Sequence, residues 1–222
     1  MSQAKETRRR KSVEAQTAPN RATATIEAII EAAERLWGAH GIEGASLREI
    51  SIAAGSANKS SIGYHFGDKQ GLIRAIFEAR IPALEDRRRP LLAAAEAEGK
   101  LDDPITLLRI AFLPVFEEVD RHGRHSFAAF LRAINRFAQW DGRTGIQQLA
   151  PLASAAFNIL RQKVSHMPQD LVEARLRLAN EICYGAITDQ DDNPPATGPD
   201  PVLATKMFED ALAASAHLML LG

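Results

Sequence analysis

The stretch SLREISIAAGSANKSSIGYHFGDK, residues 46–69, decides how this chain of 222 residues is interpreted. Its first four residues show the S-x-x-E pattern of a capping box, which predicts the start of a helix. Gly55 is the predicted end of that helix, because glycine adopts the left-handed conformation at a helix C-terminus at little cost. Asn58 is then a predicted N-cap for a short helix that runs to about His65. Two short helices joined by a glycine turn are typical of a helix-turn-helix, whose second helix enters the major groove of DNA.

The second short helix, KSSIGYHF, carries side chains that suit a DNA groove. Ile62 and Phe66 are four residues apart, so we expect them to anchor one helix face in the core of the domain. The outward face then offers hydroxyls, an ammonium group and an aromatic ring to base edges or phosphates. Gly63 costs roughly 1 kcal/mol relative to alanine in a helix, which either a close approach or simple tolerance explains. The predicted DNA-facing residues here are Asn58, Lys59, Ser60, Ser61, Tyr64 and His65.

Lys69 follows Asp68, the predicted cap of the next helix. A cation in the first turn of a helix opposes the helix dipole. A DNA phosphate at this N-terminus would bind both the free N–H groups and the ammonium group. An exposed lysine that tolerates a penalty of a few tenths of a kcal/mol is the alternative. Beside Tyr64 and His65, the phosphate interpretation is favoured.

Composition and charge are those of an ordinary globular protein. Hydrophobic residues make up 45% and charged residues 25% of the chain. The net charge of −1 divides into +3 over residues 1–80 and −4 over residues 81–222, which allows DNA contact at one end, although ordinary scatter explains it equally well. No apolar run approaches the ~18–20 residues that span a bilayer, and the polar, basic start does not resemble a secretory signal. The lone Cys183 fits a reducing cytoplasm, the expected location.

The periodicity of apolar residues predicts an all-α protein in four parts. Residues 1–20 are polar, contain the run RRRK and are predicted to be a disordered basic tail, which either lies on DNA or is merely solvated. Residues 21–68 form the helix-turn-helix domain, and residues 69–81 a connecting helix that Pro82 limits. Residues 82–222 form a larger helical domain.

No two-residue alternation marks a strand in this larger domain. Pro114 lies inside an apolar run and is expected to kink or interrupt its helix. The acidic, proline-rich residues 189–201 are the clearest linker. The predicted helices lie near residues 83–98, 102–121, 124–140, 145–166, 169–187 and 201–221.

Residues 25–80 resemble the DNA-binding domain of the TetR family of bacterial transcriptional regulators. The resemblance is carried by the segment IEAIIEAAERLWGAHGIEGASLREI, then AAG, then the block YHFGDKQGLIRAIF. It departs from the usual pattern at Gly63, where many members carry an aromatic residue, and in a turn over residues 56–61 that is one residue longer.

The resemblance implies a role for individual positions. Arg48 matches a position that reaches a base in some members, and a surface ion pair is its alternative role. The positions that match phosphate contacts are Tyr64, His65 and Lys69, and those that often face bases are Lys59 and Ser61.

The resemblance also implies that the larger domain binds an effector and forms dimers. Helices 169–187 and 201–221 stay apolar late in the chain and are the expected interface of a homodimer. The middle helices hold most of the aromatic residues, which suits a cavity for a lipophilic effector or, alternatively, a plain core. The candidate pocket residues are Phe112, Phe116, His122, Phe127, Phe130, Ile134, Trp140 and Phe157.

Other classes of function find less support. No nucleophile elbow, HExxH motif or phosphate-binding glycine loop indicates an enzyme. His122 and His125 are three residues apart but have no third ligand partner, so no metal or other cofactor is expected. A helical scaffold with a helix-turn-helix would not need the aromatic cluster. The sequence therefore predicts a cytoplasmic, ligand-responsive regulator, a repressor rather than an activator, that binds operator DNA and no membrane.

Overall fold

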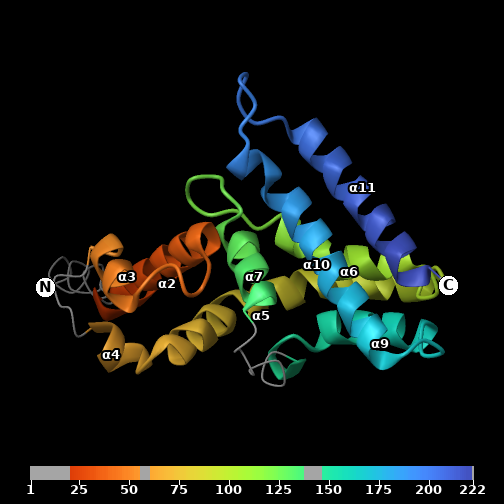
Figure 1. Ribbon diagram of the computed structural model, residues 1–222, viewed down its shortest axis with the longest axis horizontal. Helices are drawn as coiled ribbons and strands as arrows, with labels where there is room; N and C mark the ends of the chain where they lie inside the picture. Colours follow the sequence, from red (N-terminus) through yellow and green to blue (C-terminus); the bar gives the residue numbers. More distant parts are fainter. Residues whose placement is uncertain (1–20, 56–60, 138–146, 222) are drawn as a thin grey trace, which may run out of the picture.

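The computed structural model describes residues 21–55, 61–137 and 147–221, and among these residues it contains helices and no strand (Figure 1). The predicted all-α fold is confirmed. Figure 1 shows an elongated molecule with α2, α3 and α4 at one end and α6, α9, α10 and α11 at the other. The helices are α2 (Arg21–His40), α3 (Leu47–Ala53), α4 (Ser61–Phe66), α5 (Lys69–Ala97), α6 (Pro104–Phe116), α7 (Ser126–Arg136), α9 (Pro151–Lys163), α10 (Gln169–Asp192) and α11 (Pro201–Leu220).

Helix α5 is the longest of these and joins the two ends of the molecule. Its 29 residues span about 43 Å at 1.5 Å per residue. The predicted end at Pro82 is wrong, because the helix continues through both Pro82 and Pro90. Both proline rings are exposed, whereas Leu84 and Arg88 are buried on the other side of the helix. Burial of that side holds the helix together despite the two missing backbone hydrogen bonds.

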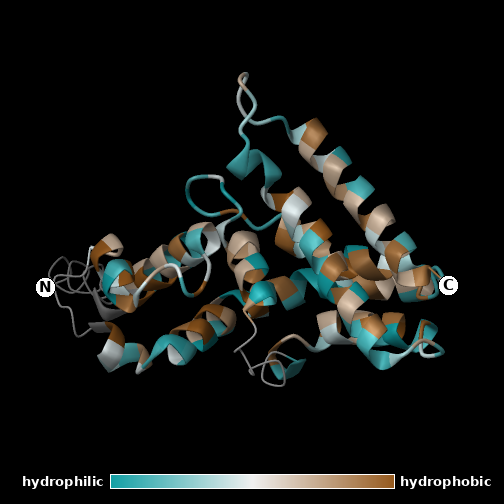
Figure 2. Ribbon diagram, in the orientation of Figure 1, coloured by the Kyte–Doolittle hydropathy of each residue, from teal (hydrophilic) through white to brown (hydrophobic). Residues whose placement is uncertain are grey.

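The later helices differ from the predictions mainly at their ends. Helix α6 is shorter than the predicted 102–121 and contains Pro114 in its last turn without ending there. Helix α10 is longer than predicted and takes in the first residues of the expected linker. Acidic side chains cap α6 and α11: Asp103 accepts from the N–H of Thr106 at 3.1 Å, and Asp200 accepts from the N–H of Leu203 at 3.0 Å. Figure 2 shows hydrophobic positions that recur as stripes along the helices.

A continuous core joins the N-terminal helices to the rest of the molecule. Trp37 of α2 is fully buried and donates from its indole N–H to the carbonyl of Ala45 at 3.0 Å. Its ring stacks on Phe130 of α7, with centroids 6.2 Å apart. Gly38 lets α2 and α7 approach closely, since a Cβ there would lie 2.7 Å from the Cβ of Ala129. The α2–α7 contact therefore joins the predicted DNA-binding domain to the larger helical domain through one continuous core.

A buried ion pair ties α2 to α5 beside this contact. The carboxylate of Glu34, only 1% exposed, accepts from Nε of Arg80 at 2.7 Å and from Nη2 at 3.0 Å. Burial raises the pKa of Glu34. Burial opposes the charged form of Arg80 too, but hydrogen bonds and charges from Glu34 and Glu27 outweigh it and raise the pKa of Arg80.

Among the residues in the described ranges, no helix is long and apolar enough to cross a membrane.

Candidate DNA-binding surface and central cavity

The first short helix of the quoted stretch begins as predicted. Ser46 Oγ accepts from the N–H of Glu49 at 3.3 Å, and a Glu49 carboxylate oxygen accepts from the N–H of Ser46 at 2.8 Å, which completes the capping box. The hydrogen bonds that its carboxylate accepts from the backbone N–H and the hydroxyl of Ser46 lower the pKa of Glu49. Arg48 is exposed on the same helix and forms no ion pair with another described residue. The surface ion pair that was its alternative role is therefore not seen.

Helix α4 presents its outward face to solvent. Ile62 is 2% exposed and anchors the inward face, with Phe66 packed against the same core. Tyr64 is 86% exposed, and its ring lies 5.1 Å from that of His65, which is also exposed. A Cβ on Gly63 would meet no atom within 4 Å, so the packing of the described residues does not require glycine there. The predicted contacts Asn58, Lys59 and Ser60 lie outside the described residues, and for Ser61 the structure gives only its place at the start of α4.

The corner between α4 and α5 is closely packed. Asp68 caps α5 by accepting from the N–H of Gly71 at 2.8 Å. A Cβ on Gly71 would lie 1.8 Å from the carbonyl oxygen of Phe66, so no larger residue fits there. Gly67 turns the chain with a φ of 75°. The short helix α4 is thus held at a defined angle to α5.

Lys69 has partners inside the domain. Its Nζ donates to the carbonyl of Ile42 at 2.9 Å and lies 3.6 Å from a carboxylate oxygen of Glu43. These contacts join the start of α5 to the turn between α2 and α3. They explain why a cation stands at a helix N-terminus, and no bound phosphate is needed for that explanation. The Lys69 side chain is still 30% exposed, so the predicted phosphate contact remains open to it.

A cavity of about 260 Å³ lies among α5, α6, α7, α9 and α10. Four of the predicted pocket residues line it, namely Phe112, Phe127, Ile134 and Phe157. Helix α5 contributes one wall through Phe77, Ile81, Leu84 and Arg88, none of which the sequence identified as a pocket residue. We call this space the central cavity.

Three of the other predicted pocket residues do not line this cavity. Phe130 is fully buried behind the cavity wall, with its ring centroid 5.5 Å from that of Phe77. Phe116 stacks on Phe208 of α11 at 4.5 Å and so belongs to the α6–α11 contact. His122 is exposed in the loop before α7, where its Nε2 lies 3.2 Å from Nε of Arg121. Trp140 lies outside the described residues.

A buried ion pair beside the cavity ties three helices together. Arg88 donates to Glu85 at 2.9 Å and to the carbonyl of Ala111 in α6 at 2.8 Å. Glu85 in turn accepts from the N–H groups of Leu152 at 2.7 Å and Ala153 at 3.3 Å, at the start of α9. Both side chains are below 10% exposed, and burial lowers the pKa of Arg88. The sequence analysis missed this pair. In the charged run EDRRR, Glu85 and Arg88 look like an ordinary surface ion pair, and nothing in the run itself indicates that they are buried.

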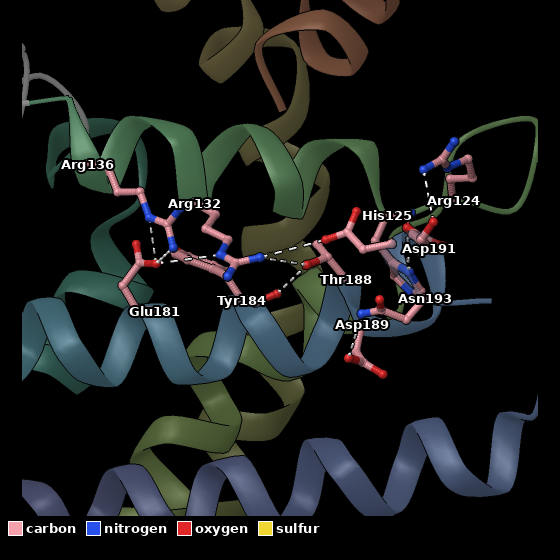
Figure 3. Close-up of polar contacts among 11 residues, drawn as sticks. Arg124, His125, Arg132, Arg136, Glu181, Tyr184, Thr188, Asp189, Asp191 and Asn193 are labelled. Atoms are coloured by element: carbon pink, nitrogen blue, oxygen red, sulfur yellow. Dashed lines mark hydrogen bonds and ion pairs between the residues drawn. The ribbon is translucent and has the colours of Figure 1, made fainter. Parts of the chain in front are cut away.

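A polar seam joins α7 to α10 (Figure 3). Glu181 accepts from Nδ2 of Asn135 at 2.8 Å, pairs with Arg136 and lies 3.5 Å from Nε of Arg132. Burial favours the protonated form of Glu181, but these donors outweigh burial and lower its pKa. At the other end of the seam, Asp191 accepts from the backbone N–H of His125 at 2.6 Å. The seam thus fixes α7 against α10 at both ends.

The late helices leave an apolar stripe uncovered within the described residues. Leu171, Leu178 and Ile182 of α10 are 41%, 54% and 36% exposed, at a spacing that puts them on one face. Leu203 of α11 is 44% exposed. Phe208 is buried inside the protomer with Leu212, and neither is available to an interface.

The N-terminal helices therefore place the chain among the helix-turn-helix proteins. Helices α3 and α4 form the motif, and α4 is exposed and packs against α5. Residues 29–76 match the model of the bacterial regulatory proteins of the tetR family. The N-terminal part of the chain thus carries the domain that this family model describes.

Curated relatives match over part of the chain. One is the "Probable HTH-type transcriptional regulator ArpR" of Pseudomonas putida, 34% identical over 91 residues, which are 41% of this chain and 40% of the relative. Another is the "HTH-type transcriptional repressor AcnR" of Corynebacterium glutamicum, 33% identical over 93 residues, which are 39% of this chain and 46% of the relative. The matches thus span less than half the length of these relatives.

Proposed function

We propose that this protein is a DNA-binding transcriptional regulator that acts as a homodimer and leaves its operator when a small lipophilic molecule occupies the central cavity. The observation that carries the proposal is that one helix, α5, serves both sites. Its first turn packs against the end of α4, where Gly71 lies against the carbonyl of Phe66, and its middle supplies Phe77, Ile81 and Leu84 to the cavity wall. The names of the similar proteins, among them a repressor, support the regulatory role and the choice of repressor.

The DNA contacts would come from the exposed side chains of α3, α4 and the start of α5. Tyr64 and His65 lie at the C-terminal end of α4, where they can reach a phosphate, and Arg48 is free to reach a base or a phosphate. Lys69 would exchange part of its contact with Glu43 for a phosphate oxygen. Asn58, Lys59, Ser60 and Ser61 remain proposed groove contacts.

The proposed partner in the dimer is a second copy of the chain, which would pack on α10 and α11. The stripe Leu171, Leu178 and Ile182, together with Leu203, gives this interface an apolar centre. A dimer must place its two recognition helices about 34 Å apart, or at a multiple of one DNA turn. A small change in the tilt of α5 would alter this separation, so an effector that prefers one tilt would shift the population away from the bound form.

A mobility-shift titration tests the DNA-binding role. The full chain and double-stranded DNA that flanks its own coding region should form a complex whose affinity falls steeply with salt. Tyr64→Ala should weaken binding roughly tenfold, because it removes one phosphate contact, while Tyr64→Phe separates the hydroxyl from the ring. Val119→Ala, at an exposed apolar position in the loop between α6 and α7, is the control and should bind as the wild type does.

Tyr64 is so exposed that its replacement should leave the unfolding midpoint unchanged, which isolates the effect on DNA. Equal binding by the wild type and Tyr64→Ala would remove Tyr64 from the interface. A wild-type protein that binds these fragments no better than unrelated DNA would contradict operator recognition.

A further inference from the structure

We propose that the hydroxyl of Tyr184 on α10 recognises the effector, and that the central cavity takes a neutral one- or two-ring molecule that carries a carbonyl group. The inference rests on the proposed function and adds the chemical class of the effector. Tyr184 lines the cavity, and its ring meets that of Phe112 of α6 edge to face, with centroids 5.4 Å apart. The ring is thus part of the apolar wall, and its hydroxyl is a polar group set in that wall.

The hydroxyl of Tyr184 is unpartnered and accessible. Beyond the backbone hydrogen bonds of α10, the contact of this kind that Tyr184 makes with a described residue is through its carbonyl, which accepts from Oγ1 of Thr188 at 3.0 Å. Within the described ranges, the unpartnered polar side-chain atoms that are also enclosed are Ser51 Oγ and Asn180 Oδ1. The Tyr184 hydroxyl is not one of these enclosed atoms, so a small molecule can contact it.

The accessible side of this hydroxyl faces the central cavity rather than the outside of the molecule. Burial raises the pKa of Tyr184, so the hydroxyl lies deep in the protein. The positive charge of Arg88 lowers the same pKa in part, which places the hydroxyl toward α5, where Arg88 also lines the cavity. Tyr184 is nevertheless only half-buried. Accessible surface at such depth is the surface of a cavity, and the central cavity is the one that Tyr184 lines.

The chemistry of this hydroxyl favours a ligand that accepts a hydrogen bond. A phenol is a strong donor and a weak acceptor, because its oxygen lone pair is delocalised into the ring. The nearby charge of Arg88 makes the O–H bond more polar and strengthens it further as a donor. Arg88 itself is held by Glu85 at 2.9 Å and by the carbonyl of Ala111 at 2.8 Å. We therefore assign to Tyr184 the hydrogen bond that a carbonyl oxygen in the cavity would accept.

The size and lining of the cavity limit the rest of the molecule. About 260 Å³ accommodates one or two fused rings rather than a long lipid chain. Phe112 and Phe157 meet edge to face at 5.9 Å on one wall, which leaves ring faces and edges for an aromatic guest. Arg88 and Arg161 are each paired with a carboxylate. An anionic ligand would lose its hydration without gaining either of these cations, so a neutral carbonyl compound is favoured.

Isothermal titration with three ligands of one shape tests the inference, with the full chain added to each sparingly soluble ligand. The ligands are 2-acetylnaphthalene, which carries a carbonyl, 2-isopropenylnaphthalene, in which a methylene group replaces the oxygen, and 2-naphthoate, which is an anion. We expect 2-acetylnaphthalene to bind at least about tenfold more tightly than the other two, because the alkene would leave the hydroxyl covered and unpaired. In Tyr184→Phe the preference for the ketone over the alkene should disappear. The alkene should still bind to this variant, which shows that the cavity is intact.

Tyr64→Phe is the matched control for ligand binding. It removes the same hydroxyl from the other tyrosine of the chain, which is exposed on α4 and does not line the cavity. This variant should keep the full preference for the ketone. Infrared difference spectra give a direct readout: the C=O stretch of the bound ketone should lie at lower frequency in the wild type than in Tyr184→Phe, because a hydrogen bond weakens the C=O bond.

Each other outcome overturns the inference. Equal binding of the ketone and the alkene by the wild type would show that the cavity does not select an acceptor. A preference that survives in Tyr184→Phe would exclude Tyr184 as the donor. Tighter binding of 2-naphthoate would point to the exposed Arg177, which also lines the cavity, and to an anionic effector. Binding of none of the three would exclude this class of ligand.

The operator titration distinguishes this failure from failure of the proposed function. A protein that binds its operator but none of the ligands retains the regulatory role and loses only the inferred effector class. A protein that binds 2-acetylnaphthalene selectively but no DNA keeps the role of Tyr184 and loses the role in transcription.

Discussion

The outward face of α4 and the central cavity are built in opposite ways. The side chains of α4 come from one short run of sequence and point into solvent, with Tyr64 86% exposed. The cavity draws on five helices between Phe77 and Tyr184, and two of its arginines are paired with carboxylates, Arg88 with Glu85 and Arg161 with Glu173. A change on α4 should therefore alter binding without altering stability, whereas a change at the cavity should alter both.

The largest effect is expected from Glu85→Ala, which leaves Arg88 buried without its carboxylate and the start of α9 without its acceptor. We expect the free energy of unfolding to fall by about 3–5 kcal/mol, as measured by urea denaturation. The double change Glu85→Leu with Arg88→Met should recover most of this loss, since it removes both charges. Asp86→Ala, at an exposed pair on the same helix, should unfold at the wild-type urea concentration. A near-wild-type Glu85→Ala would show that the network does not hold the cavity wall.

A smaller loss is expected from Gly38→Ala at the α2–α7 contact. Alanine favours the helix by about 1 kcal/mol, but the added methyl group would overlap Ala129, for a net loss of about 1–2 kcal/mol. The matched change Gly63→Ala meets open space and should instead stabilise by up to about 1 kcal/mol. Thermal unfolding of the two variants gives the two signs. Stabilisation by both would mean that the α2–α7 contact is looser than described.

Lys69→Ala tests whether one residue can contribute both to DNA binding and to stability, because Lys69 has both an internal contact and an exposed part. If it also binds a phosphate, DNA affinity should fall roughly tenfold, and the slope of log affinity against log salt should decrease by about one. Lys100→Ala, at an exposed lysine in the turn after α5, should leave the slope unchanged. A Lys69→Ala protein that is less stable but has an unchanged salt slope would assign the lysine to the fold alone.

The smallest effect is expected from Glu181→Gln in the α7–α10 seam. Since the pKa of Glu181 is lowered in the folded protein, its charge stabilises the fold above the unfolded value near 4.5, and this contribution is lost as the pH falls through the lower folded value. The variant should lose about 1 kcal/mol at pH 7, and this loss should shrink steadily as the pH falls below 4.5. Urea unfolding over a series of pH values from 7 downward measures the difference. A loss that does not change with pH would point to packing rather than charge.

What could be predicted from the sequence follows the same division. The capping box at Ser46 and the cap at Asp68 are local patterns, and both are confirmed. The pocket was only partly predictable, because aromatic residues at helical spacing line a cavity or fill a core equally well. Phe127 and Phe130 illustrate this: they are three residues apart on α7, yet one lines the cavity and the other lies behind its wall.

The prediction that the helix ends at Pro82 was wrong for a related reason. Proline weakens a helix locally by about 3 kcal/mol, but burial of the opposite face decides whether the helix continues. That burial depends on α6 and α9, which come later in the chain. Likewise, Glu85 and Arg88 could not be distinguished from a surface pair before the start of α9 was known to lie above them.

The hydrogen bond from Trp37 to Ala45 gives the protein a spectroscopic reporter. The indole is fully buried, stacks on Phe130 and lies beside the closest approach of α2 to α7. An indole in such dry surroundings should emit at short wavelength, and its emission should shift to the red if the contact opens to water. With Trp140 replaced by phenylalanine, the fluorescence of Trp37 alone would follow, in real time, whether the DNA-binding helices move against the cavity domain when a ligand enters.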